Sequence, residues 1–260
     1  MRSARQILAA VVLIAVILWC LEEAGQDAYR IRKGVPFLIR YLISMWPPDF
    51  SILPFLEIPI VESVRMAVAG IVVSTAVSVP VSFLAARNTA PFFSVYLTTR
   101  WVIIVLRGIP ALLLALLFVS LAGLGPLPGI LALTFHGIGV LSKDFSEVIE
   151  SIGPSELEIL EAMRVDGANE IQVLVHGLFP AVLPFFASHA LSRFESNVRS
   201  ASVLGLVGAG GLGIPLNESI QFFHRHETLT IVLVIFALAA AVDIVSRLLR
   251  ARILNRTYLE

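Results

Sequence analysis

The sequence predicts an all-α integral membrane protein, and three observations carry that prediction. Of its 260 residues, 57% are hydrophobic and only 15% are charged. The mean hydropathy is +0.89, whereas a soluble domain of this size is far less apolar. The apolar residues fall in several long runs, whereas the strands of a membrane β-barrel would alternate apolar and polar residues. These runs favour a bundle of about six transmembrane helices.

The chain begins with Arg2 and Arg5, followed by an apolar run over residues 7–21. A signal peptide has a similar pattern, but this run ends in WCLEE and lacks the small residues of a cleavage site. We therefore expect an uncleaved first span. Residues 35–46 then predict an amphipathic helix at the membrane interface, ended by Pro47-Pro48.

Five further apolar segments predict the remaining spans, at residues 60–86, 99–121, 126–141, 181–206 and 228–245. The segment at 99–121 is interrupted by Arg107-Gly108-Ile109-Pro110, and the segment at 126–141 is short. We expect three parts of the chain: an N-terminal span with an external segment at residues 1–59, a transmembrane core at 60–250, and a tail at 251–260.

Basic residues near span ends predict the orientation of the chain. With six spans, one side of the membrane receives Arg2, Arg5, Arg87, Arg100, Lys143, Arg164 and the arginines after Ser246. That side is expected to be cytoplasmic, with both termini inside. Four basic residues between positions 26 and 59 depart from this rule.

A polar stretch, residues 161–180, interrupts the apolar chain between the fourth and fifth predicted spans. The Ser-x-x-Glu spacing at residues 155–158 predicts a capping box that starts a short helix. Asp166-Gly167 predicts the end of that helix, with Gly167 in a left-handed conformation. A second helical run is expected over residues 170–178. The stretch is thus a helix–turn–helix on the cytoplasmic side; the alternative is an ordinary amphipathic hairpin.

The fifth predicted span contains charged residues, each of which costs roughly 3 kcal/mol at the centre of a membrane helix. Helical spacing places Glu195 and Arg199 on one face with Ser188, Ser192 and Ser202, and their separation of four suits an ion pair. We predict that polar residues of this span line a translocation path: Ser192, Arg193, Glu195, Ser196, Asn197, Arg199, Ser200 and Ser202. The alternative is a structural salt bridge between spans, and both interpretations can hold.

Glycines cluster at residues 205–213, directly after this span. We predict a bend or re-entrant turn near the outer surface that acts as a gate, formed by Gly208, Gly210, Gly211 and Gly213. Close helix packing through small residues is an alternative. The spacing also fits G-x-G-x-x-G, but a dinucleotide site needs that pattern between a strand and a helix.

Several function classes find no support in the sequence. The net charge is zero, which gives no sign of a nucleic-acid partner. The single cysteine, Cys20, excludes an intrachain disulfide and a cysteine-based metal cluster. His224 and His226 alternate in a polar loop, a pattern more typical of solvated side chains than of metal ligands. We predict no catalytic residue and no metal site.

Residues 161–180 resemble the EAA loop of ABC-importer permeases. The family pattern is Glu-Ala-Ala, three residues, Gly, nine residues, an aliphatic residue, one residue, Leu and Pro. Four positions of this chain match it: Glu161, Ala162, Gly167 and Pro180. Three positions depart from it: Met163 replaces the second Ala, Gly177 the aliphatic residue and Phe179 the Leu.

A second resemblance is to the permease of phosphonate ABC importers. It rests on RFESNVRSA at residues 193–201, on VGAGGLG at 207–213, and on RGIP at 107–110 with ALLFV at 115–119. The glycine segment is also similar to that of methionine-type permeases, so RFESNVRSA is the specific part. The resemblance covers about residues 59–250.

The resemblance implies a type I ABC importer permease fold in a bacterial plasma (inner) membrane. It implies as partners cytoplasmic ABC ATPase subunits, an external phosphonate-binding protein, membrane lipid and a second permease, expected to be another copy of this chain. The permease would not be an enzyme and would hold no cofactor, because ATP and Mg belong to the ATPase. Coupling to the ATPase is expected through Glu161, Ala162, Asp166, Gly167 and Ala168.

The function that follows is a path for phosphonate or a related oxyanion, phosphate or phosphite. A path that bears Arg193 and Arg199 suits an anion. The first alternative is a permease of the same fold for another solute, such as methionine. A stand-alone secondary transporter is a further alternative, but no internal repeat with two broken helices is visible. An intramembrane enzyme is the least favoured.

Overall fold

A computed structural model describes residues 14, 19 and 32–257, and the described residues form helices and turns without a strand. The chain divides into two compact units, Met1–Pro48 and Asp49–Glu260. In the first unit residues 32–44 are helical, which confirms a helix before Pro47-Pro48. Of the predicted first span, only Ile14 and Trp19 lie within the described residues. The functional division at residues 59 and 250 stays a prediction.

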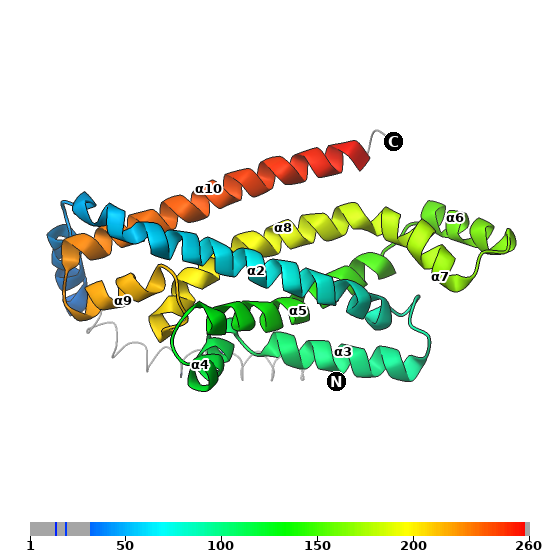
Figure 1. The fold of residues 1–260 in the computed structure, drawn as a ribbon, viewed down its shortest axis with the longest axis horizontal. Coiled ribbons are helices and arrows are strands. Elements are labelled where there is room, and N and C mark those ends of the chain that lie inside the picture. The colour runs from blue at the N-terminus through cyan, green and yellow to red at the C-terminus, as the bar shows by residue number, and fades with distance from the viewer. Residues whose placement is uncertain (1–13, 15–18, 20–31, 258–260) are drawn as a thin grey trace. The chain divides into compact units, whose positions relative to one another are not determined.

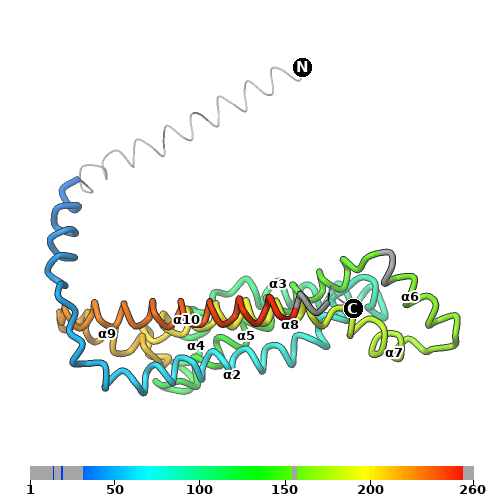
Figure 2. The backbone as a smooth tube through the Cα atoms, turned by 90° about the horizontal axis from the view of Figure 1, so that it is seen from above, coloured from blue at the N-terminus to red at the C-terminus, as the bar shows by residue number. Residues whose placement is uncertain are grey.

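The second unit is a bundle in which the long helices run side by side (Figure 1). A short 3-10 turn, Phe50–Ile52, leads into it. Its α-helices are, in chain order, α2 (Leu53–Ala85), α3 (Phe93–Gly108), α4 (Ala111–Ala122), α5 (Pro126–Glu150), α6 (Pro154–Val165), α7 (Glu170–Gln172), α8 (Phe179–Leu204), α9 (Gly213–Gln221) and α10 (Arg225–Thr257). The pair α6 and α7 extends beyond one end of the bundle, and α9 lies at the other end (Figure 2).

Three described stretches are long and apolar enough to cross a membrane: Phe50–Ala85, Glu170–Val207 and Arg225–Ile253. Helices α3 and α4 make a fourth if a pair bent by 83° counts as one span. The bend follows Gly108, where the predicted interruption lies, and Pro110 caps α4. These stretches confirm the second, third, fifth and sixth predicted spans as helices, with shifted bounds.

Helix α5 corresponds to the predicted fourth span, and it lies in the centre of the bundle against α2, α3, α4 and α8. Small residues allow this close packing. A Cβ at Gly137 would lie 2.9 Å from the Ser74 side chain, and one at Gly139 would lie 2.6 Å from the Arg107 backbone nitrogen. The Ser78 hydroxyl donates to the Ile138 carbonyl across the α2–α5 contact, at 3.3 Å.

A hydrophobic core ties the α6–α7 end to the bundle. Leu160 of α6 is buried with residues of α5 and α8, and the rings of Phe145 and Phe186 stack with centroids 4.1 Å apart. The core also includes Val173 and Leu178, which precede α8. Because these side chains are buried together, α6 is packed against the C-terminal part of α5 and the N-terminal part of α8.

Candidate functional site

Helices α6 and α7 form the predicted helix–turn–helix. The C-cap of α6 is Asp166, and Gly167 follows with φ +93°, the left-handed conformation expected there. The Gly167 N–H donates to the Arg164 carbonyl at 3.1 Å, and the Ala168 N–H donates to the Met163 carbonyl at 3.0 Å. This pair of hydrogen bonds is a Schellman motif, which requires a residue that tolerates positive φ.

The start of α6 differs from the sequence prediction. The helix begins at Pro154 with Gly153 as N-cap and has no side-chain cap, so the capping box expected at residues 155–158 is wrong. Proline suits the first helical position because its φ is already helical and its missing N–H has no intrahelical acceptor there. The capping box lies at α7 instead, between Asn169 and Gln172, with both hydrogen bonds at 2.9 Å.

The second helical run does not stop before the fifth span. A π-helical segment, Val173–Leu178, joins α7 directly to α8. Pro180 lies inside this continuous stretch, directly after the π-helical segment, so its missing N–H removes one backbone hydrogen bond. Glu170–Val207 is thus one continuous helical stretch.

Met163 and Gly177, two of the departures from the EAA pattern, lie against each other. A Cβ at Gly177 would approach the Met163 sulfur to 2.9 Å and the Leu160 Cδ2 to 2.5 Å. The long side chain at 163 thus occupies the space that an aliphatic side chain at 177 would need. The two departures compensate for each other in volume.

The turn between α6 and α7 is held by an ion pair between Arg164 and Glu170. Arg164 donates to both carboxylate oxygens of Glu170, at 3.0 and 3.1 Å. These hydrogen bonds to Glu170 raise the pKa of Arg164 above its ordinary value. Of the residues expected to couple, Glu161, Ala162, Asp166 and Gly167 are exposed, and Ala168 is half-buried. Val165 of α6 and Ile171 of α7 are also exposed, at 87% and 72%.

The predicted Glu195–Arg199 ion pair forms on α8, with Arg199 Nη1 2.8 Å from Glu195 Oε1. These two residues and Ser202 line a cavity of about 620 Å³ between α8, α9 and α10. The Arg199 side chain is 51% exposed, whereas that of Glu195 is 16% exposed. Ser192 and Ser188 do not line this cavity; the Ser192 hydroxyl donates to the Ser188 carbonyl at 3.2 Å.

Arg193 and Asn197 lie on another face of α8. Asn197 is fully buried, and a Cβ at Gly70 of α2 would lie 3.6 Å from its amide nitrogen. Neither amide atom of Asn197 has a hydrogen-bond partner, and nothing in the structure explains this. Arg193 interacts electrostatically with Asp144 of α5, which also lies 3.8 Å from the His189 ring. The structure therefore does not bring the whole predicted path together, and Ser196 and Ser200 are half-buried.

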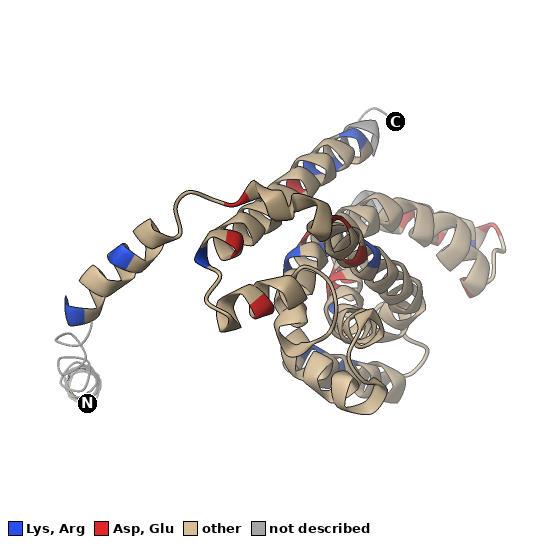
Figure 3. Cartoon of the chain, turned by 60° about the vertical axis from the view of Figure 1, so that its left-hand side comes forward, with Lys and Arg blue, Asp and Glu red and all other residues tan. Residues whose placement is uncertain are grey.

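Three charged residues of α10 were not among the predicted site residues. Asp243 lines the cavity and accepts from Arg247 at 2.6 Å, and Arg250 Nη2 lies 3.9 Å from Glu195 Oε2. Basic residues gather toward the C-terminal end of α10 (Figure 3). The arginines were read only as markers of orientation. Asp243, a carboxylate inside an apolar span, was the signal that could have revealed this face.

The glycine cluster forms the tight turn expected after the fifth span. Gly208, Gly210 and Gly211 have φ values of +83°, +88° and +73°. The Gly211 N–H donates to Glu62 Oε2 at 3.1 Å, and the Leu212 N–H donates to Ser63 Oγ at 2.9 Å. The turn joins two helices and is fastened to α2. A role as a gate, which would also involve Gly213, stays a prediction.

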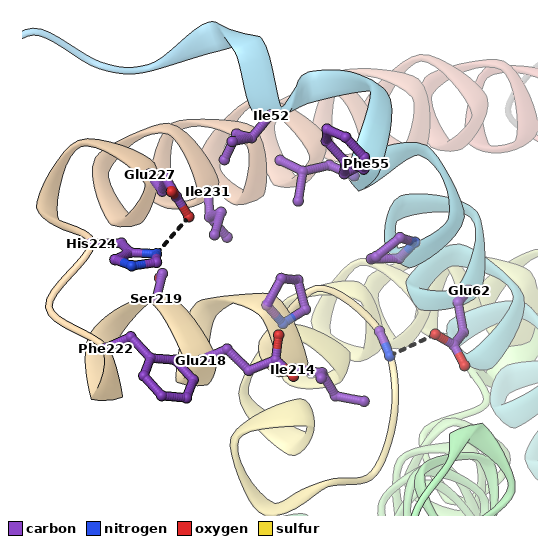
Figure 4. A pocket seen from close by; sticks show the side chains of 14 residues that line it. Ile52, Phe55, Glu62, Ile214, Glu218, Ser219, Phe222, His224, Glu227 and Ile231 are labelled. Atoms are coloured by element: carbon purple, nitrogen blue, oxygen red, sulfur yellow. Dashed lines mark hydrogen bonds and ion pairs between the residues drawn. The ribbon is translucent and has the colours of Figure 1, made fainter.

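A second cavity, of about 540 Å³, lies beside this turn (Figure 4). Its lining comes from the start of α2, from α9 and from the start of α10. It includes the carboxylates Glu62, Glu218 and Glu227, and His224 lies 3.2 Å from Glu227. Among the described residues that line it there is no lysine or arginine. Because its charge is negative, this cavity does not suit an anion.

Residues 78–257 match the family model "Binding-protein-dependent transport system inner membrane component". The chain belongs to this family. It is 38% identical over 241 residues to a phosphite transport system permease protein of Stutzerimonas stutzeri, covering 93% of this chain and 86% of that one. It is 36% identical over 224 residues to a phosphate-import permease protein of Mycolicibacterium smegmatis, covering 85% of this chain and 41% of that one.

This permease has the type I ABC importer fold. A chain of the inward-facing methionine ABC transporter MetNI superposes with a TM-score of 0.67 at 18% identity, covering 79% of this chain and 99% of that one. The chain is therefore a multi-pass inner-membrane subunit of a binding-protein-dependent importer. It is a transport subunit rather than an enzyme, which agrees with the sequence-based prediction.

Proposed function

We propose that this permease forms the translocation path for a small tetrahedral oxyanion, namely phosphite, phosphate or a phosphonate, delivered by an external binding protein. The single observation that carries the proposal is the 38% identity to a phosphite permease over 93% of this chain. The cavity charges support it, because Arg199 presents a half-exposed guanidinium group. A guanidinium pairs well with phosphoryl oxygens.

In this proposal the ATPase docks on α6 and α7 in the cytoplasm. The positive residues at that end of the bundle support this orientation. Glu150, the last residue of α5, accepts from the Arg87 backbone at 2.8 Å and from the Arg100 side chain at 2.7 Å. Arg87 and Arg100 thus lie at the end of the bundle from which α6 begins. Both chain termini would be on the same side.

The second permease subunit in this proposal is another copy of the same chain. A facing copy would cover the side of α8 and α10 where Arg199 is exposed and would close the path. ATP and Mg would be held by the ATPase subunits, with no cofactor in this chain. Binding of ATP would move α6 and α7, and through the π-helical segment the movement would reach α8.

Methionine is the second candidate solute, because the fold is that of the MetNI permease. That likeness, at 18% identity, reflects the fold alone. The arginines around the cavity favour a small oxyanion over a zwitterion with an apolar side chain, which brings its own positive charge.

The test is ATPase activity of the reconstituted permease–ATPase complex with its binding protein. Phosphite, phosphate, methylphosphonate and methionine are each added at the same concentration. The proposal predicts stimulation by at least one of the three oxyanions and none by methionine. Stimulation by methionine alone would contradict it.

A further inference from the structure

The cavity between α8 and α10 has apolar walls and one charged end. Its walls come from Val203, Leu206, Leu216, Val232 and Phe236, among others. At the other end lie Glu195, Arg199 and Asp243. Charged groups in such surroundings interact more strongly than in water, since little water screens them. The charge balance at this end therefore decides what the cavity can hold.

The charged groups at this end do not balance. Glu195, Arg199 and Asp243 line the cavity, and among the described residues ion pairs join Arg247 and Arg250 to the two carboxylates from outside its lining. Three positive and two negative charges leave a surplus of one positive charge. Asp243 is engaged by Arg247 at 2.6 Å. Glu195 is therefore shared between the two remaining arginines.

Glu195 is shared unequally. One carboxylate oxygen accepts from Arg199 at 2.8 Å, and the other lies 3.9 Å from Arg250. The Nε and Nη2 atoms of Arg250 are buried and make no hydrogen bond. Arg250 thus has unused donors close to Glu195, and a small shift of the carboxylate toward Arg250 would release the guanidinium of Arg199.

We propose that this cavity is an oxyanion-binding site within each permease subunit, and that Glu195 takes the anion's place on Arg199 while the site is empty. An entering tetrahedral oxyanion would pair with the Arg199 guanidinium and compensate the surplus positive charge. Glu195 would then turn to Arg250. In the empty state Glu195 is shared between Arg199 and Arg250, and with the anion bound each arginine has an anionic partner of its own. This inference rests on the proposed function and adds the site and the residue exchange to it.

The experiment uses the full-length permease in detergent, with Cys20 replaced by serine. Val203→Cys places a thiol in the cavity, one helical turn after Arg199. Leu183→Cys is the matched control, because it lies on the same helix outside the cavity. The exposed fractions of the native side chains are 49% at Val203 and 48% at Leu183.

The rates of modification by an anionic and a cationic methanethiosulfonate reagent are measured at both positions. The proposal predicts that the anionic reagent reacts several-fold faster than the cationic one at position 203, with no such preference at 183. Phosphite, phosphate or methylphosphonate should slow the reaction at 203 several-fold and leave 183 unchanged. Equal rates for the two reagents, or no protection, would overturn the proposal. A position 203 that reacts with neither reagent would also overturn the proposal, because a small anion then has no access to the cavity.

Variants of the two paired residues test the exchange itself. Glu195→Gln should lower the oxyanion concentration needed for protection several-fold, since the internal competitor is gone. Arg199→Gln should abolish protection, and Arg199→Lys should retain part of it. An unchanged rate at Leu183→Cys checks that each variant is folded. Protection that persists in Arg199→Gln would overturn the proposal. If the whole importer takes up oxyanions but oxyanions do not protect the thiol at position 203, only this inference is refuted. If oxyanions protect that thiol but the importer does not take them up, the proposed function is refuted.

Discussion

At the scale of single residues, Met163 and Gly177 show how the coupling loop tolerates departures from the family pattern. Large and small side chains have exchanged places between α6 and the π-helical segment. A methyl group added at 177 meets both Met163 and Leu160 within 3 Å. The glycine is therefore set by its neighbour and not by its backbone conformation.

This exchange predicts strong coupling between the two positions. Gly177→Val alone should destabilise the protein by about 1–3 kcal/mol through overpacking, and Met163→Ala alone should leave a cavity. The double variant should recover at least about 1 kcal/mol relative to the sum, because the side chain at 177 then meets only Leu160 and fills part of the space left by Met163. Thermal unfolding of the four proteins in detergent measures this. Strictly additive shifts in Tm would show that the two side chains do not share a space.

The residues of RFESNVRSA show what the sequence could and could not predict about the site. The Glu195–Arg199 pair followed from its spacing of four residues and is present. Arg193 and Glu195 differ by two residues, about 200° around a helix, so they cannot share a face. Which face meets α10 and which meets α5 depends on tertiary packing. That information, and with it the role of Asp144 and Arg250, was not in the local sequence.

At the scale of helices, the continuity from α7 to α8 is the feature on which the proposed coupling depends. The sequence predicted the turn at Gly167 from Asp-Gly, and the turn is present. It did not predict the π-helical segment, because no residue pattern marks it and Pro180 suggested a break. The predicted end of the fourth span at residue 141 was also too early. Helix α5 continues to Glu150, with Ser142 and Ser146 buried and Glu147 and Glu150 exposed.

Substitution of Gly167 tests the mechanical role of this turn. A Cβ there meets no atom within 4 Å, so only the backbone conformation resists a side chain. Gly167→Val should cost about 1–3 kcal/mol of local strain, displace α7 and weaken binding of the ATPase. Gly167→Asn is the control, because asparagine tolerates the left-handed conformation. Pull-down of the ATPase by each variant measures the effect. Normal transport by Gly167→Val would show that this turn does not couple the subunits.

At the scale of the whole molecule, composition and apolar runs were enough to predict a helical membrane bundle, and the resemblance to ABC-importer permeases implied the type I fold. They could not fix its packing, because the bundle is held by small residues that carry no pattern of their own. The contact of Gly137 with Ser74 is one example. Orientation rests on the basic residues that gather at the α6–α7 end.

Labelling from outside the cell tests that orientation. Single cysteines are introduced at Asn169, before α7, and at Gln221, the last residue of α9, with Cys20 replaced by serine. A membrane-impermeant thiol reagent applied to intact cells should label Gln221→Cys and leave Asn169→Cys unlabelled until the cells are opened. The reverse pattern would place α6 and α7 outside and remove them as a docking site for the ATPase.

In the proposed function, the charged face of α8 carries the oxyanion and does more than hold helices together. If Glu195 and Arg199 only neutralise each other, replacing both with neutral residues of similar size should restore folding and transport together. The matched control is another charge pair four residues apart, Lys143 and Glu147 on α5, which are 2.6 Å apart.

The decisive measurement is binding-protein-dependent uptake of phosphite, phosphate and methylphosphonate into proteoliposomes that contain the complete importer. For Glu195→Gln with Arg199→Met we predict a folded complex with ATPase activity and at least about a tenfold loss of uptake, equivalent to about 1.4 kcal/mol of lost stabilisation of the passing anion. Lys143→Met with Glu147→Gln should transport like the wild type. Uptake at the wild-type rate by the Glu195→Gln, Arg199→Met variant would contradict this role and show that Glu195 and Arg199 form only a structural salt bridge.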